Sequence, residues 1–84
     1  MLHNSHYVGD VEVIDKGLAT VVVKNRFSVG DRIEIIHPLG NSEFVLNKMY
    51  NEEGEPIDVA AGSGHRVRIP MDEKWKNALL TRFI

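Results

Sequence analysis

Apolar and polar residues alternate along most of this chain, and a repeat of two residues is the pattern of a β-strand with one buried face. The clearest case is segment 18–26, where Ala19, Val21 and Val23 share one face while Lys24 and Arg26 share the other. Its many β-branched residues also favour an extended backbone. Because the dominant period is two and not 3.6, the chain is predicted to fold as an all-β domain.

Similar alternation predicts further strands over residues 7–15, 32–37, 43–50, 57–60, 65–69 and 78–84. Gly9 interrupts the first of them, which is typical of a β-bulge or a bend. Lys16-Gly17 reads as a tight turn between the first two strands. The segment 71–77 is expected to form one helical turn, with Asp72 as its cap and Trp75 packed beneath it.

Exposed strand edges are a hazard for any sheet, and closing the sheet on itself removes them. We therefore expect residues 1–84 to form a single small closed antiparallel β-barrel of about six to seven strands. The alternation also predicts the residues that face the core: Val11, Val13, Val21, Val23, Ile33, Ile35, Leu46, Val67 and Ile69.

The chain of 84 residues is long enough for one core but leaves little room for a deep active-site cleft. It has no cysteine, which excludes disulfides, thiolate nucleophiles, zinc-thiolate sites and iron–sulfur ligation. No apolar run has the length of a membrane span, and residues 1–6 contain no secretory signal. The chain is therefore expected to act in the cytoplasm without a membrane partner.

Four short blocks follow one another along the chain: Ser-His-Tyr-Val-Gly at 5–9, Val-Lys-Asn-Arg-Phe-x-Val-Gly-Asp at 23–31, Ile-Ile-x-Pro-x-Gly at 35–40, and Met-x-x-x-x-Gly-Glu-Pro at 49–56. In this order and spacing the chain resembles the C-terminal domain of peptidase family U-32 proteins, the collagenase-like proteases. The resemblance extends from His6 to Ile84, and the Lys-Asn-Arg-Phe block with Gly30 and Asp31 is its most specific part.

The resemblance implies a β-barrel similar to the second domain of translation elongation factors. It also implies an N-terminal catalytic domain in the same polypeptide, which would be this domain's partner. The members that it most resembles carry out prephenate-dependent hydroxylation of the wobble uridine of tRNA. The chain would then be a non-catalytic accessory or substrate-binding domain with no cofactor of its own. The alternative is a substrate-recognition or structural domain of a collagenase-like peptidase.

The residues themselves offer no catalytic set. Ser63 lies in a Gly-Ser-Gly turn and not in the strained elbow that exposes a nucleophilic serine, although backbone N–H groups there with Arg66 leave a weak anion site open. His3 and His6 lack the helix that would place both rings on one metal. Three glutamates at 52, 53 and 55 read as a solvated turn, because nothing apolar encloses them. We expect no catalytic residue and no metal site.

The basic residues remain as candidates for contacts with nucleic acid. Lys24 and Arg26 share one strand face, and Arg66 and Arg68 share another. If those strands are neighbours, the four cations would line one strip that tracks the phosphate backbone of tRNA. The alternative is an ordinary solvated face, since Glu12 and other outward carboxylates would neutralise the strip and the net charge is −2. The oligomeric state stays open.

The Arg-Phe-x-Val-Gly-Asp segment is expected to have a structural role. Phe27 would plug the end of the barrel, Gly30 would occupy a turn, and Asp31 would complete the motif.

Overall fold

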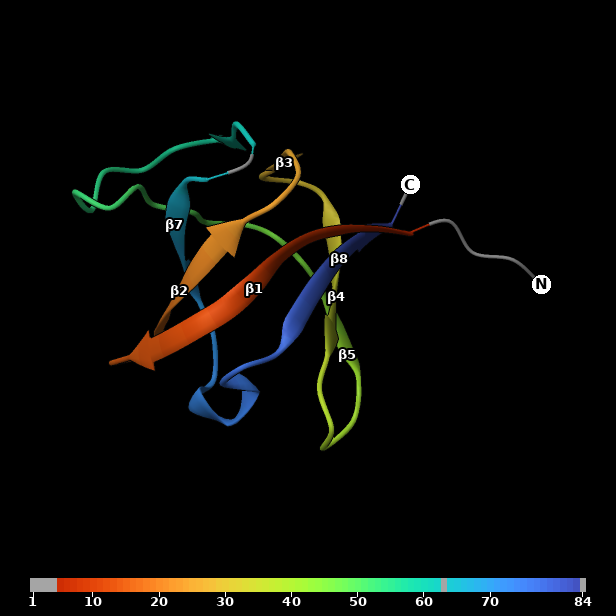
Figure 1. Ribbon diagram of the computed structural model, residues 1–84. Helices are drawn as coiled ribbons and strands as arrows, with labels where there is room; N and C mark the ends of the chain where they lie inside the picture. Colours follow the sequence, from red (N-terminus) through yellow and green to blue (C-terminus); the bar gives the residue numbers. More distant parts are fainter. Residues whose placement is uncertain (1–4, 63, 84) are drawn as a thin grey trace.

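A computed structural model describes residues 5–62 and 64–83, whose regular secondary structure is almost entirely β-strand (Figure 1). These residues contain no α-helix and form one 3₁₀ turn, η1 (Glu73–Trp75). The strands are β1 (Ser5–Asp15), β2 (Leu18–Val23), β3 (Phe27–Ser28), β4 (Arg32–Ile36), β5 (Ser42–Val45), β6 (Val59–Ala60), β7 (Arg66–Pro70) and β8 (Leu79–Phe83). The prediction of an all-β chain is confirmed.

Six strands form one antiparallel sheet in the order β5-β4-β8-β1-β2-β7, and β3 pairs separately with β6. The expectation of a closed barrel is wrong, because no ladder joins β5 to β7 and the sheet is an open half-barrel. The expected strand 43–50 ends early, at Val45, where Leu46 turns to exchange backbone hydrogen bonds with Gly30 and Asp31. Beyond the end of β5, Tyr50 bridges to Arg68 of β7, and the N–H group of each donates to the other's carbonyl oxygen, at 2.8 and 2.7 Å.

The long strand β1 carries two β-bulges, one between Tyr7 and Gly9 and one between Val11 and Val13. The first bulge confirms the interpretation of Gly9 as an irregular point. The second makes the expected core position of Val13 wrong, because one extra residue reverses the alternation of faces and leaves Val13 45 % exposed.

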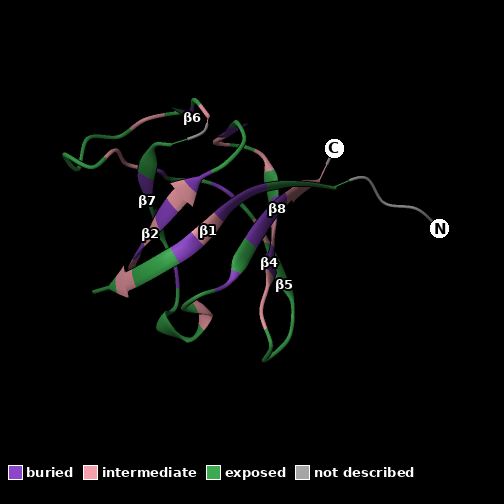
Figure 2. Cartoon of the chain, in the orientation of Figure 1, coloured by how far each residue is buried: buried purple, intermediate pink, exposed green. Residues whose placement is uncertain are grey.

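All other predicted core residues are buried, and Figure 2 shows buried positions along most strands of the sheet. Phe27 is buried among them with 1 % exposure, and Gly30 has the turn conformation φ 99°. The list of expected core residues did not include several further ones: Val8, Met49, Ala60, Met71, Ala78 and Leu80.

The C-terminal part of the described chain follows the expected order of a helical turn and then a strand. Asp72 caps η1 by accepting a hydrogen bond from the backbone N–H of Lys74 at 2.9 Å, and Trp75 packs against the core. β8 then lies between β4 and β1, at the middle of the sheet (Figure 1). Within the described residues no helix is both long and apolar enough to cross a membrane.

Candidate nucleic-acid interface

The two strands near which the four candidate cations lie, β2 and β7, are neighbours at one edge of the sheet. β2 pairs with β7, so that Arg66 lies opposite Val22 and Arg68 lies opposite Thr20. Val21 and Val67, which alternate with these residues, are buried, so Arg66 and Arg68 both belong to the convex outer face.

Lys24 and Arg26 lie beyond the end of β2, which stops at Val23 and not at Arg26 as expected. The strand stops because the N–H groups of Lys24 and Asn25 both donate to the carbonyl oxygen of Val8, at 2.8 and 3.3 Å, which turns the chain away from β7. Both cations are therefore exposed in a bend and not on a strand.

Arg66 is paired with a carboxylate from the same face. Its Nε and Nη2 atoms donate to the two oxygens of Glu12 at 3.0 and 3.3 Å. These hydrogen bonds and the charge attraction hold the pKa of Glu12 below its usual value and raise that of Arg66. Among the described residues, Lys24, Arg26 and Arg68 have no such ion pair, so they are the cations available to a ligand.

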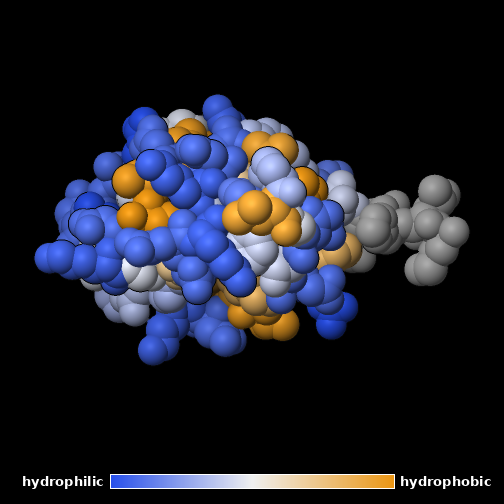
Figure 3. All heavy atoms as spheres, turned by 90° about the horizontal axis from the view of Figure 1, so that it is seen from below, coloured by the Kyte–Doolittle hydropathy of each residue, from blue (hydrophilic) through white to orange (hydrophobic). Residues whose placement is uncertain are grey.

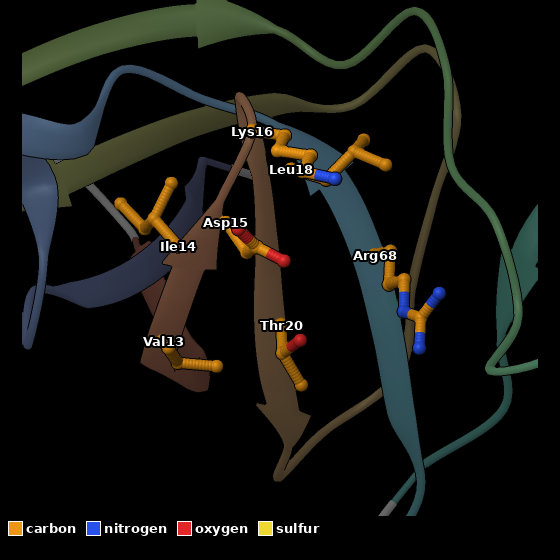
Figure 4. A pocket seen from close by; sticks show the side chains of 7 residues that line it. All are labelled: Val13, Ile14, Asp15, Lys16, Leu18, Thr20 and Arg68. Carbon is orange, nitrogen blue, oxygen red and sulfur yellow. The ribbon is translucent and has the colours of Figure 1, made fainter.

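Arg68 borders an open pocket of about 560 Å³ on the outer face (Figure 4). The side chains that line it come from β1, the turn after it, β2 and β7: Val13, Ile14, Asp15, Lys16, Leu18, Thr20 and Arg68. The pocket thus combines two cations and a hydroxyl with apolar walls and one carboxylate. Sequence alternation missed it because the bulge in β1 is what turns Val13 outward.

Arg82 is a further cation that the sequence analysis did not single out. With Arg26, Phe27 and Ser28 it lines a second, smaller cleft of about 310 Å³. Asp31 stands beside this cleft, where its carboxylate accepts a hydrogen bond from the N–H of Ser28 at 2.7 Å. The spacing Leu80-x-Arg82 could have drawn attention to this arginine, because residues two apart in a strand share a face and Leu80 is a core residue.

Apolar side chains are scattered over the rest of the surface. The large apolar residues that are exposed come from different strands and loops: Tyr7, Val13, Leu39, Val45, Val59 and Leu79. The face seen in Figure 3 is largely hydrophilic, with separate hydrophobic spots. That face therefore suits polar and charged contacts better than a broad apolar one.

The residues considered for catalysis or metal binding do not assemble into a site in the part of the chain that the structure describes. No group of three or more His, Asp or Glu residues there is placed to hold a metal ion. The ring of His37 instead packs edge-on against Trp75, with 5.6 Å between centroids. Glu55 closes a turn with Asn51. His3 and Ser63 lie outside the described residues.

Comparisons with known proteins agree on one family. The family model described as the peptidase family U32 C-terminal domain matches residues 3–82. The tRNA hydroxylation protein P of Escherichia coli is 44 % identical over 79 residues, which are 90 % of this chain and 17 % of that protein. The protein of the same name from Haemophilus influenzae is 43 % identical over 70 residues, which are 81 % of this chain and 15 % of its own length. The chain thus spans about one sixth of these relatives.

Solved structures give the same result. The crystal structure of the C-terminal domain of a Geobacillus thermoleovorans protein assigned to the U32 peptidases has a TM-score of 0.81 and 27 % identity, and the match covers 94 % of this chain and 92 % of that one. Its selenomethionine variant has a TM-score of 0.80 and 26 % identity, with 89 % and 96 % covered.

Proposed function

The chain belongs to the family of peptidase U32 C-terminal domains, and from that premise we propose that it is an accessory domain that helps a catalytic domain of the same polypeptide to hold tRNA. The observation that carries the proposal is a set of exposed cations without carboxylate partners among the described residues, Lys24, Arg26 and Arg68. They occur in a domain whose curated relatives are named for tRNA hydroxylation.

In this proposal residues 1–84 form one domain that binds but does not catalyse. The hydroxylation of the wobble uridine belongs to the rest of the full-length protein, in the cytoplasm, where tRNA is found. One fact supports this division: the chain matches only 15 % and 17 % of its relatives' lengths. An accessory domain adds substrate affinity without taking part in the chemical step.

Charge sets the strength and the character of the contact. The net charge of −2 gives no overall attraction to RNA, so the affinity must come from local cations. Cations that neutralise phosphates release condensed counterions, and each such contact adds roughly 0.7 to 0.9 to the slope of log affinity against log salt. A modest affinity that falls steeply with salt is therefore expected.

The test uses the full-length protein and labelled tRNA at two salt concentrations. Replacing Lys24, Arg26, Arg66 and Arg68 together by Gln should weaken tRNA binding and flatten its salt dependence, with the rate of the chemical step on bound tRNA unchanged. The matched control removes four exposed cations elsewhere, Arg32, Lys48, Lys74 and Lys76, and should change binding less. Equal affinities and slopes for the wild type and the first variant would leave the domain a purely structural role.

A further inference from the structure

Arg82 lies on the core-facing side of the sheet, where an arginine is unusual. In the register of β8 it stands opposite Ile33 of β4 and His6 of β1. Ile33 is completely buried, and residues directly opposite each other in an antiparallel pair project to the same face. Arg82 therefore points to the concave side of the half-barrel, and its side chain remains 35 % exposed there.

The guanidinium of Arg82 has no hydrogen-bond acceptor among the described residues. Its Nε atom is buried and unpaired. The carboxylate of Asp31 is 3.8 Å from Nη1, which is too long for a hydrogen bond, and the nearer oxygen already accepts from the N–H of Ser28. Because a guanidinium carries five donors and buried donors are nearly always paired, Arg82 is suited to donate hydrogen bonds to an anionic ligand.

The space beside this guanidinium is the cleft of about 310 Å³ lined by Arg26, Phe27, Ser28 and Arg82, which we call the Arg26–Arg82 cleft. Arg26 brings a second guanidinium from the bend after β2, and unlike Arg82, whose Nη1 atom is 3.8 Å from Asp31, it has no ion pair within the described chain. Ser28 brings a hydroxyl group. The two arginines are 56 residues apart in the sequence, yet both border one small cavity and both have donors without acceptors in the described chain.

The balance of charge indicates the chemical class of the ligand. Two guanidinium groups and the nearby carboxylate of Asp31 leave the cleft with one net positive charge. A phosphodiester carries one negative charge, and its oxygens match the planar fork of arginine donors. A carboxylate carries the same charge. If the domain holds tRNA, however, the anions closest to this exposed cleft are the phosphates of the RNA backbone.

We propose that the Arg26–Arg82 cleft binds a phosphate group, and that in the full-length protein this group is a backbone phosphate of tRNA. The choice of phosphate over carboxylate and the identity of the RNA rest on the proposed function, whereas the affinity of the cleft for a singly charged oxyanion does not. The cleft gives Arg82 a role that its place in the sheet does not explain.

The first experiment follows the chain by NMR during titration with inorganic phosphate, with chloride at the same ionic strength as the reference. A domain of nearly the same extent was crystallised on its own, so this chain is suited to study in isolation. The Nε–H signals of Arg26 and Arg82 and the amide of Ser28 should shift and saturate with phosphate. The shifts should disappear in Arg26→Gln, which is expected to fold because the Arg26 side chain is exposed.

Two results would overturn the phosphate site. One is the absence of saturable shifts in the wild type. The other is the same shifts in Arg26→Gln and in Arg82→Gln, provided that both variants keep the dispersed spectrum of the folded chain.

The second experiment measures tRNA binding by the full-length protein with three double variants. The cleft variant R26Q/R82Q should lower the affinity and reduce the salt slope by roughly 0.7 to 0.9 for the phosphate that is lost. The matched control K48Q/K76Q removes the same charge at exposed positions outside the cleft and should change the affinity less. The third variant, K24Q/R68Q, tests the remaining strip without touching the cleft.

The outcomes separate the two proposals. Weaker tRNA binding by K24Q/R68Q together with unchanged binding by R26Q/R82Q would overturn the cleft as a tRNA site and leave the proposed function standing. Saturable phosphate shifts with equal tRNA affinities for all variants would refute the proposed function and leave a phosphate site of another source.

Discussion

At the scale of single residues, Phe27 is the side chain on which the core depends most visibly. It is 1 % exposed and sits where β3 pairs with β6, beside Ala60. Phe27→Ala removes a ring that the surrounding strands cannot replace, so it should lower the free energy of unfolding by about 3–5 kcal/mol. Chemical denaturation measures this, with Leu39→Ala as control, since Leu39 is 76 % exposed. A loss below about 1 kcal/mol would show that the ring is not packed as described.

Tyr7 offers a pH-dependent test at the same scale. Its hydroxyl donates to the carboxylate of Asp10, and this hydrogen bond, with some burial and the negative charge of Asp10, raises the pKa of Tyr7 from 10.0 to about 12. The folded state then keeps the proton when the unfolded state has lost it. The stabilisation is therefore present below the unfolded pKa and is lost as the pH rises from about 10 to about 12.

Ultraviolet titration of the phenolate checks this shift. In a Tyr50→Phe background Tyr7 is the remaining one of the two tyrosines. Its midpoint should lie near pH 12 and fall toward 10 when Asp10→Asn removes the charge. If Asp10→Asn left the titration midpoint of Tyr7 unchanged, the hydrogen bond between Tyr7 and Asp10 would be contradicted.

At the scale of elements, β1 is shaped by its bulges, and Gly9 stands at the first of them. A Cβ atom built on Gly9 would lie 2.6 Å from the carbonyl oxygen of Val22 and 2.9 Å from the side chain of Val21. Because the first neighbour is backbone of the paired strand, Gly9→Ala should push β1 from β2 and cost about 1–3 kcal/mol. Thermal unfolding measures it against Ser42→Ala at the exposed edge, which should stay within about 0.5 kcal/mol.

Periodicity predicted most elements because their faces alternate without interruption. β2 and β7 were found this way, and so was the turn at Lys16 and Gly17, both of which have positive φ. Val13 was misplaced because a bulge is a tertiary feature that leaves only a faint trace in the sequence. β5 ends early because the backbone of Leu46 forms hydrogen bonds with residues 30 and 31. The local alternation of residues carries no information about partners so distant in sequence.

The candidate site shows the same limit. The alternation of faces placed Lys24 and Arg26 on a strand. The strand ends before both residues, where the N–H groups of Lys24 and Asn25 donate to the carbonyl oxygen of Val8. The cleft that joins Arg26 to Arg82 depends on β8 packing against two strands distant in sequence. Sequence reasoning could therefore name most of the cations but not the groups that they form.

At the scale of the whole molecule, the open sheet predicts a gradient of local stability. β8 and β1 have hydrogen-bonded partners on both sides, whereas β5 is an edge strand with mostly exposed residues. Amides at the centre should exchange with solvent only through global unfolding, and those of β5 through smaller openings. Hydrogen exchange followed by NMR measures both. Protection in β5 equal to that in β8 would mean that the edge is covered in solution.

The central place of β8 also governs how the chain reaches this structure. β8 is the last of the described strands in sequence, yet it alone joins β4 and β5 to β1, β2 and β7. Until residues 79–83 are captured, the hairpins on either side have no shared partner, and the loops to be closed span most of the chain. A topology with such a high contact order folds in milliseconds to seconds and not in microseconds. We therefore expect the pairing of this one short strand with β4 and β1 to limit the rate of folding.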